Sequence, residues 1–428
     1  MTASDRRIAA PGWAAPLLLA CGIAALWWSG WAGIEGTIVP QRIDFEQFHA
    51  PTIQRFADLP FGDAVRDYGA APFPLFYIVF GALLAATRSM MALTAGSIAL
   101  CIGVLAIAAI LAHARFPGEV GGATVALFGF LLASPYLRGQ TLWVNTDVMP
   151  LLFLLAALLF DRRYDDRGGV GDQAMALLFG FLAFYTRQFY LFVPAYLAVR
   201  YILIDRQNRV PCLALCAVLS LPGIVLILTW HGVVPPSFAQ HEQRPYPLAA
   251  LPYVFANLLL YFAPVWILAL LRRRDEIRAT FRDRRVVAVT VAAWLAYLCY
   301  FLLSPSEFFE IGGGLVAQLF QRLPVSRVTS FQLLALVSST CVPLLAYLVA
   351  QDWRRNMVIL IYVACFMPTG IIFQRYFDPS SVVLLFLAMR VSEVQLLLRG
   401  RGRYAYPVLE LAIAAVGFVH YGRLFNVF

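Results

Sequence analysis

Long apolar segments alternate with short polar segments along almost the whole chain. An apolar stretch of about 20 residues is long enough to cross the hydrocarbon core of a membrane as an α-helix. The spans that this pattern predicts are 13–34, 91–113, 119–135, 147–160, 173–186, 189–204, 210–230, 249–271, 286–304, 328–350, 357–373, 380–398 and 404–425. We therefore expect an all-α, polytopic membrane protein with about 13 transmembrane helices, folded as one membrane domain over residues 1–428.

The apolar run at 72–87 is an exception. It holds about 16 residues, which is marginal for a crossing, and it begins Pro72-Phe73-Pro74. Basic residues collect in cytoplasmic loops. The basic clusters are 6–7, 161–167, 205–209, 272–285, 354–355 and 399–403. They fall on one side of the membrane only if 72–87 does not cross. We therefore expect a re-entrant or interfacial helix there, inside a first external loop at 35–90, with a cytoplasmic N-terminus and an external C-terminus.

Composition supports a membrane protein and narrows its partners. Hydrophobic residues make up 61% of the chain, and its mean hydropathy is +0.74. The net charge of +9 comes from arginines between apolar runs, so we expect membrane lipid and no nucleic acid as partners. All 33 basic residues are arginine, a bias typical of GC-rich genomes, which predicts a bacterial inner membrane protein. The seven cysteines lie inside apolar segments, where we expect packing residues and neither disulfides nor a zinc site.

The polar loop after the first span carries several groups that are able to react or bind. Asp44, Glu46, His49, Gln54 and Arg55 fall within twelve residues. Acids, bases and cations at the mouth of a membrane helix are typical of a functional site. The same pattern fits an amphipathic helix that lies on the bilayer surface with its polar face in water. Spacing alone leaves both interpretations open.

The string Phe48-His49-x-Pro51-x-x-Gln54-Arg55-Phe56 resembles the first luminal loop of the terminal α-1,2-glucosyltransferases of the dolichol-linked oligosaccharide pathway. These enzymes belong to the GT-C class of integral-membrane glycosyltransferases, which use a polyprenyl-phosphate sugar as donor. The family pattern has two adjacent acids before the Phe-His pair, whereas Phe45 separates the two acids here. Glu46 keeps the family spacing, and Asp44 falls one residue away from it.

Two further motifs resemble those enzymes in matching order, and each has a structural alternative. Asp147 follows Asn145-Thr146 at an external helix start, where it is either a second acid of the site or a helix cap. Arg187 lies in Thr186-Arg187-Gln188 between two apolar segments. It is either a phosphate ligand or an arginine that snorkels to the headgroups.

The third motif is Gln374-Arg375-Tyr376-Phe377 near the end of the chain. The resembling enzymes have Arg-Tyr-Phe followed by proline, whereas Asp378 intervenes here. A short-range ion pair between Arg375 and Asp378 is the structural alternative.

The resemblance implies a GT-C fold with juxtamembrane helices in the first external loop. It implies an inverting hexosyltransferase, for glucose as one candidate, which acts on the hydroxyl of a glycan or lipid-linked acceptor at the external, periplasmic face. Glu46 is the expected base, supported by Asp44 and oriented by His49, and Arg187 and Arg375 are the expected ligands of the donor phosphate. The expected substrate-binding residues are Gln54, Arg55, Asp147, Gln188 and Tyr376.

Two matters stay open on the sequence. The spacing of acids and histidines indicates no metal site, although some GT-C relatives need a divalent cation. Separately, His231, His241 and Glu242 are additional candidates for contact with the acceptor. The alternative function is a transporter or a lipid or oligosaccharide flippase, in which the same acids would relay protons and the arginines would bind an anionic substrate.

Overall fold

The computed structural model describes residues 39–116, 131, 135–204, 208–239, 248–303, 312–367 and 372–390. The predicted spans 13–34 and 404–425 lie outside this part of the chain, as do most of 119–135, the end of 380–398, His241 and Glu242. In the described part, the regular structure is helical apart from one parallel pair of two-residue strands, β1 (Gly312–Gly313) and β2 (Ile372–Phe373). The all-α fold class is therefore confirmed.

Four helical segments in the described part are long and apolar enough to cross a membrane. They are α6 (Met90–Arg115), α12 (Arg209–Trp230), α16 (Arg284–Leu303), and the segment Arg327–Gln351, which contains α18 (Arg327–Ser338) and α19 (Cys341–Gln351). Large apolar side chains on α12 and α16, such as Leu228 and Val289, are exposed. Exposed apolar faces of this length are typical of helices that contact lipid. These findings support a membrane protein, whereas the count of 13 spans stays a prediction.

The predicted first external loop consists of short helices. They are α2 (Val39–Asp44), η2 (Phe45–His49), α3 (Ala50–Asp58), α4 (Phe61–Arg66) and α5 (Leu75–Thr87). A helix of 13 residues is about 20 Å long, less than the roughly 30 Å of a hydrocarbon core. Helix α5 packs closely on α3, because a Cβ atom at Gly81 would lie 2.7 Å from the Cβ atom of Phe56. This short helix fits the expected interfacial segment.

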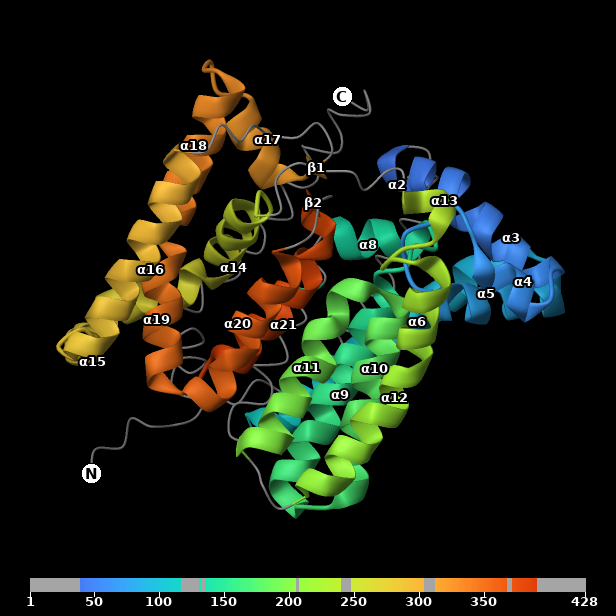
Figure 1. Cartoon of the computed structure of the whole chain (residues 1–428), viewed down its shortest axis with the longest axis horizontal. Helices are drawn as coiled ribbons and strands as arrows, with labels where there is room; N and C mark the ends of the chain where they lie inside the picture. The colour runs from blue at the N-terminus through green and yellow to red at the C-terminus, as the bar shows by residue number, and fades with distance from the viewer. Residues whose placement is uncertain are drawn as a thin grey trace, which may run out of the picture.

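The remaining helices form two groups that meet at α20 and α21 (Figure 1). The first group contains α6, α8 (Pro135–Leu142), α9 (Val148–Arg167), α10 (Val170–Thr186), η3 (Gln188–Leu191), α11 (Phe192–Val199), η4 (Arg200–Ile204), α12 and α13 (Pro236–Ala239). The second contains α14 (Leu251–Arg272), α15 (Arg274–Thr280), α16, α17 (Leu315–Gln321), α18 and α19. Helix α20 (Trp353–Phe366) packs on α11, and α21 (Asp378–Ala388), which follows η5 (Gln374–Tyr376), contacts both α9 and α14. One continuous apolar core joins the two groups.

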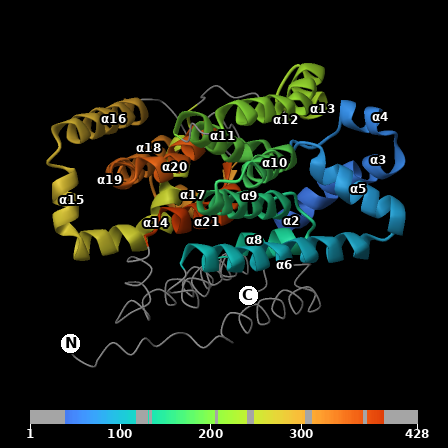
Figure 2. The same cartoon turned by 90° about the horizontal axis from the view of Figure 1, so that it is seen from below.

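Most of the described loops between the long helices lie at one or the other end of these helices. In Figure 1 the upper end carries α2, α3, α8, α13, α17 and both strands, whereas the lower end carries α15 and the turns that follow α9 and α19. Figure 2 shows that α2 to α5 all gather beside one end of α6 and of the α9 to α12 layer. At the lower end Arg200 pairs with Asp161 and Asp165, which ties η4 to α9. The upper end therefore carries several of the described segments that we expect outside the membrane, whereas the side of the membrane on which they lie stays a prediction.

Labelling with an impermeant thiol reagent tests this topology. In a variant without native cysteines, we expect single cysteines at Asp63 and Arg88 to react from outside the cell and one at Asp166 to react only after the membrane is opened. All three positions have exposed side chains, so access depends on the side of the membrane. Labelling of Arg88→Cys from the cytoplasm alone would show that the run at 72–87 crosses.

Candidate functional site

A buried ionic cluster lies at the upper end of the molecule. We define it as Asp44, His49, Asp147, Arg187 and Arg375, which come from the α2–η2 junction, the start of α9, the end of α10 and η5. Arg187 and Arg375 are only 5% and 9% exposed, and Asp147 is 3% exposed. Charged side chains are rarely buried to this extent unless they are paired. The structure thus brings together four polar motifs that are far apart in the sequence.

Asp147 and Arg187 form the inner ion pair of the cluster. The Oδ1 atom of Asp147 lies 2.5 Å from Nη1 of Arg187, and its Oδ2 atom accepts a hydrogen bond of 2.8 Å from Nε2 of Gln140. The same Arg187 nitrogen donates to the hydroxyl of Thr146 at 2.6 Å. Asp147 makes no side-chain capping bond to α9, and burial of Arg187 removes it from the surface. The capping and snorkelling alternatives therefore do not describe these two side chains.

Arg375 forms the outer ion pair, with Asp44. Asp378, the short-range alternative suggested by the sequence, accepts a hydrogen bond from the hydroxyl of Tyr261. The ring of Tyr376 lies close to both arginines, with its centroid 4.1 Å from the guanidinium carbon of Arg187 and 5.4 Å from that of Arg375. Burial lowers the pKa of Arg375, but Tyr376, Asp44 and Asp147 outweigh it and hold the pKa above its ordinary value. Both guanidinium groups therefore lie against one aromatic ring.

A π-helical turn decides which acid joins the cluster. In η2 the backbone N–H of Ala50 donates to the carbonyl of Phe45, a bond between residues five apart. A π turn accommodates one residue more than an α turn, and such turns occur mostly as single insertions at functional sites. Asp44, five residues before His49, pairs with Arg375, whereas Glu46 is 51% exposed and pairs with Arg42 at 2.8 Å. Phe45, the residue that separates the two acids, is thus accommodated in the π turn.

His49 is a neutral, buried member of the cluster. Its Nδ1 atom lies 2.8 Å from the hydroxyl of Tyr77 on α5, and the two rings stack with centroids 5.9 Å apart. Burial is the main cause that lowers the pKa of His49 from 6.5 to about 3; Arg187 and Arg375 also lower it, against an opposing contribution from Asp44. A neutral imidazole at this position holds α5 to η2 and does not carry a proton at neutral pH.

The depressed pKa of His49 predicts a loss of stability in acid. Below about pH 6.5 the unfolded chain binds a proton at this histidine and the folded chain does not, so stability falls as the pH falls toward 3. Between about pH 6.5 and pH 5 this amounts to about 2 kcal/mol. The free energy of unfolding, measured by thermal unfolding, should therefore fall less between about pH 6.5 and pH 5 in His49→Asn than in the parent protein. Equal losses in the two proteins would contradict the buried neutral imidazole.

Three other predicted residues lie outside the cluster. Nε2 of Gln54 donates to Asp58 at 2.6 Å, and Nη2 of Arg55 donates to the carbonyl of Asp63 at 2.9 Å; both bonds stay near the surface of α3. Nε2 of Gln188 donates to the carbonyls of Ala71 and Val233, at 2.7 and 3.0 Å. These side chains hold neighbouring segments together in this structure, and their contact with substrate stays a prediction. His231 is an exposed residue that ends α12 with φ +54°.

The segment 140–146 adds polar groups that the sequence analysis did not single out. Three buried atoms, Oε1 of Gln140, Nε1 of Trp143 and Nδ2 of Asn145, have no hydrogen-bond partner among the described residues, and neither has Nε of Arg187. Val144 has φ +48°, which is strained for a β-branched residue. Strain and unsatisfied buried polar groups are both commonest at functional sites. A signal was present in the sequence, because this short stretch with several polar residues lies between the predicted spans 119–135 and 147–160 and directly precedes Asp147.

The comparisons with known proteins leave the family undefined. No family model, no curated protein and no solved structure matches the chain. Among the described residues, no group of three or more histidines, cysteines and acids is arranged to hold a metal ion. What the fold and the site define is an all-α protein with helices long and apolar enough to span a membrane and, at one end, a largely buried cluster of two arginines, two aspartates and a neutral histidine.

Proposed function

We propose that this protein is an inverting GT-C glycosyltransferase of the bacterial inner membrane. It transfers a hexose from a polyprenyl-phosphate donor to a hydroxyl of a glycan or lipid-linked acceptor at the external face. The observation that carries the proposal is the buried pairing of Arg187 and Arg375 with Asp147 and Asp44 around one aromatic ring. Burial of Arg187, Arg375 and Asp147 is costly, so these three charges are better explained by function than by stability.

The two arginines suit the leaving group of this reaction. When the bond between the anomeric carbon and the phosphate oxygen breaks, the departing polyprenyl phosphate gains negative charge. Arginine remains protonated, and its planar fork binds two phosphate oxygens at once. Preorganised cations in a site that excludes water stabilise such charge strongly. The orphaned Nε atom of Arg187 is one donor that a phosphate oxygen would satisfy.

We propose Asp44 as the base that accepts the proton of the acceptor hydroxyl. The acceptor oxygen attacks the anomeric carbon from the face opposite the phosphate, its proton passes to the carboxylate, and configuration inverts. Asp44 is 23% exposed and adjoins Arg375, so its carboxylate is accessible and next to the proposed phosphate site. Family spacing favours Glu46, but its side chain lies in solvent with Arg42. Substituting Asp44 and Glu46 in separate variants shows which of the two is the base.

The unsatisfied polar atoms of segment 140–146 support a sugar as the transferred group. Trp143 and Asn145 present hydrogen-bond donors, and Gln140 presents an acceptor, all uncharged. Hexose hydroxyls donate and accept at once, so they match such a mixed set, whereas an inorganic ion does not need it. Asp44 and Asn145 both act on His49: the charge of Asp44 raises its pKa, and so does a side-chain hydrogen bond with Asn145. The same small region therefore combines groups for a sugar with groups for a phosphate.

Release of polyprenyl phosphate tests the proposal. Purified protein is incubated with a polyprenyl-phosphate hexose and a cell-envelope extract that supplies the acceptor. We expect free polyprenyl phosphate and a new glycoside, detected by mass spectrometry. A nucleotide sugar given in place of the lipid donor should not be consumed. Efficient transfer from the nucleotide sugar alone would overturn the proposal.

A further inference from the structure

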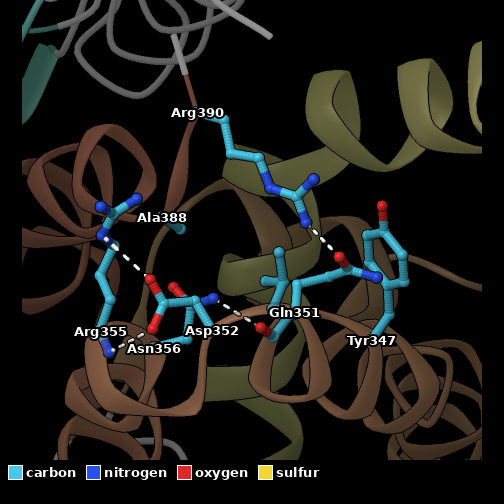
Figure 3. A pocket seen from close by; sticks show the side chains of 8 residues that line it. Tyr347, Gln351, Asp352, Arg355, Asn356, Ala388 and Arg390 are labelled. Atoms are coloured by element: carbon cyan, nitrogen blue, oxygen red, sulfur yellow. Dashed lines mark hydrogen bonds and ion pairs between the residues drawn. The ribbon is translucent and has the colours of Figure 1, made fainter. Parts of the chain in front are cut away.

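A second polar region lies at the opposite end of the helices from the ionic cluster. Here the end of α19, the start of α20, the last residue of α21 and Arg390 line a cavity of about 170 Å³ (Figure 3). Arg375 precedes α21, and Arg390 follows it, so the two regions are separated by the length of this helix. The proposed glycosyl transfer does not use this cavity.

Two arginines from different segments line the cavity. Arg390 contacts Glu276 through Nη1 at 3.2 Å and Gln351 through Nη2. Arg355 has its Nε atom 3.7 Å from Asp352, which is too long for a hydrogen bond. Its two terminal nitrogens have no hydrogen-bond partner among the described residues. Figure 3 shows the two guanidinium groups on opposite sides of the cavity, with Asp352 and Gln351 between them.

The buried side-chain amide of Asn356 places a second requirement on a ligand of this cavity. Asn356 is 3% exposed and lines the cavity. Its Nδ2 atom donates to the carbonyl of Leu348 at 2.6 Å, and its Oδ1 atom has no partner among the described residues. A buried acceptor without a partner costs free energy. A ligand that satisfies this cavity therefore needs an anionic group for the arginines and a hydroxyl or similar donor for Asn356.

We propose that this cavity binds the headgroup of an anionic phospholipid that carries both a phosphate and a hydroxyl, such as phosphatidylglycerol. Arg355 and Arg390 hold the phosphate oxygens, and Asn356 accepts a hydrogen bond from the hydroxyl. The cavity accepts a headgroup but not the acyl chains, which would lie along the apolar helices outside it. The cavity lies at the arginine-rich end, where anionic lipids of the cytoplasmic leaflet collect if the expected topology holds.

Thermal unfolding of the purified full-length protein tests this proposal. The protein is held in phosphatidylcholine nanodiscs and titrated with short-chain phosphatidylglycerol, with short-chain phosphatidylcholine, or with inorganic phosphate. Arg355→Gln removes a partly exposed charge that makes no short contact. Ala388→Leu keeps every charge and fills the cavity, since Ala388 is one of its lining residues. Arg278→Gln is the matched control, because Arg278 is an exposed arginine of the same end, on α15.

We expect phosphatidylglycerol to raise the unfolding temperature in a saturable way and phosphatidylcholine to have no effect. Loss of one charge-assisted contact should weaken binding about tenfold in Arg355→Gln, and Ala388→Leu should abolish it. Arg278→Gln should bind like the parent. Equal stabilisation by inorganic phosphate, lost in the same variants, would support the phosphate site but assign it to a soluble anion. Unchanged binding of phosphatidylglycerol in both cavity variants would overturn the site.

Discussion

Asp44→Asn is expected to reduce hexose transfer by about two orders of magnitude or more, whereas Glu46→Gln should leave it close to that of the parent. The amide keeps the size of the aspartate but cannot accept the proton of the acceptor hydroxyl. Asp44 adjoins Arg375 inside the ionic cluster, and Glu46 points into solvent beside Arg42. Initial rates of polyprenyl-phosphate release from the two purified variants measure the difference.

Asp58→Asn provides a matched control for this comparison. Asp58 is another acid of the same short helices, and it contacts Gln54 and Arg88 away from the cluster, so its variant should retain activity. Each variant is also checked for the unfolding temperature of the parent. Loss of activity in Glu46→Gln with retention in Asp44→Asn would assign the base to Glu46, as the family spacing favours. Full activity in both would remove this loop from the chemistry.

Arg187→Met should lower the free energy of unfolding by about 3–5 kcal/mol and abolish transfer. The substitution leaves the carboxylate of Asp147 buried without its cation, and among the described residues only the contact with Gln140 remains. Replacing both partners by apolar residues of similar size removes that unpaired charge. Arg187→Met combined with Asp147→Leu should therefore recover most of the stability, as thermal unfolding would show, but none of the activity.

This double variant separates the effect of Arg187 on stability from its effect on hexose transfer. A purely structural arginine would give a double variant that is both stable and active, and that outcome would contradict phosphate binding. Arg187→Lys provides a milder test, because it keeps one charge and loses the planar fork. We expect the lysine variant to fold and to transfer hexose much more slowly. The same contrast applies to Arg375→Lys, whose partner is Asp44.

The hydrophobic pattern was enough to predict the long apolar helices of the described part, but not the short helices between them, the break between α18 and α19, or the end of α20 at Phe366 before the strand β2. Segments of the length of α6, α12 and α16 follow directly from the thickness of the hydrocarbon core. The short run at 72–87 was predicted as a special segment because of its length and its two prolines, and it forms the 13-residue helix α5. The position of α5 relative to a membrane depends on the surrounding lipid, and neither the hydrophobic pattern nor the fold gives information about that lipid.

The candidate site was only partly predictable. Asp147, Arg187, Arg375 and Tyr376 were identified from short motifs that resemble one family, and the structure brings all four together. Residue spacing could not show whether Asp44 or Glu46 joins the cluster. That outcome depends on one π turn, in which the backbone N–H of Ala50 bonds to the carbonyl of Phe45. The polar atoms of segment 140–146 have no periodic spacing at all. Their place before Asp147, between two predicted spans, was the one sequence signal, and the strained backbone at Val144 and their burial reveal them in the structure.

The stoichiometry of donor cleavage tests the central claim most directly. With purified protein, labelled polyprenyl-phosphate hexose and the acceptor extract, we expect one polyprenyl phosphate released for each glycoside formed, with inverted configuration at the anomeric carbon. Release should stop when the extract is left out and should fall to background in Asp44→Asn. Movement of the intact lipid donor across the membrane of proteoliposomes without any cleavage would contradict the proposed transferase and indicate a flippase.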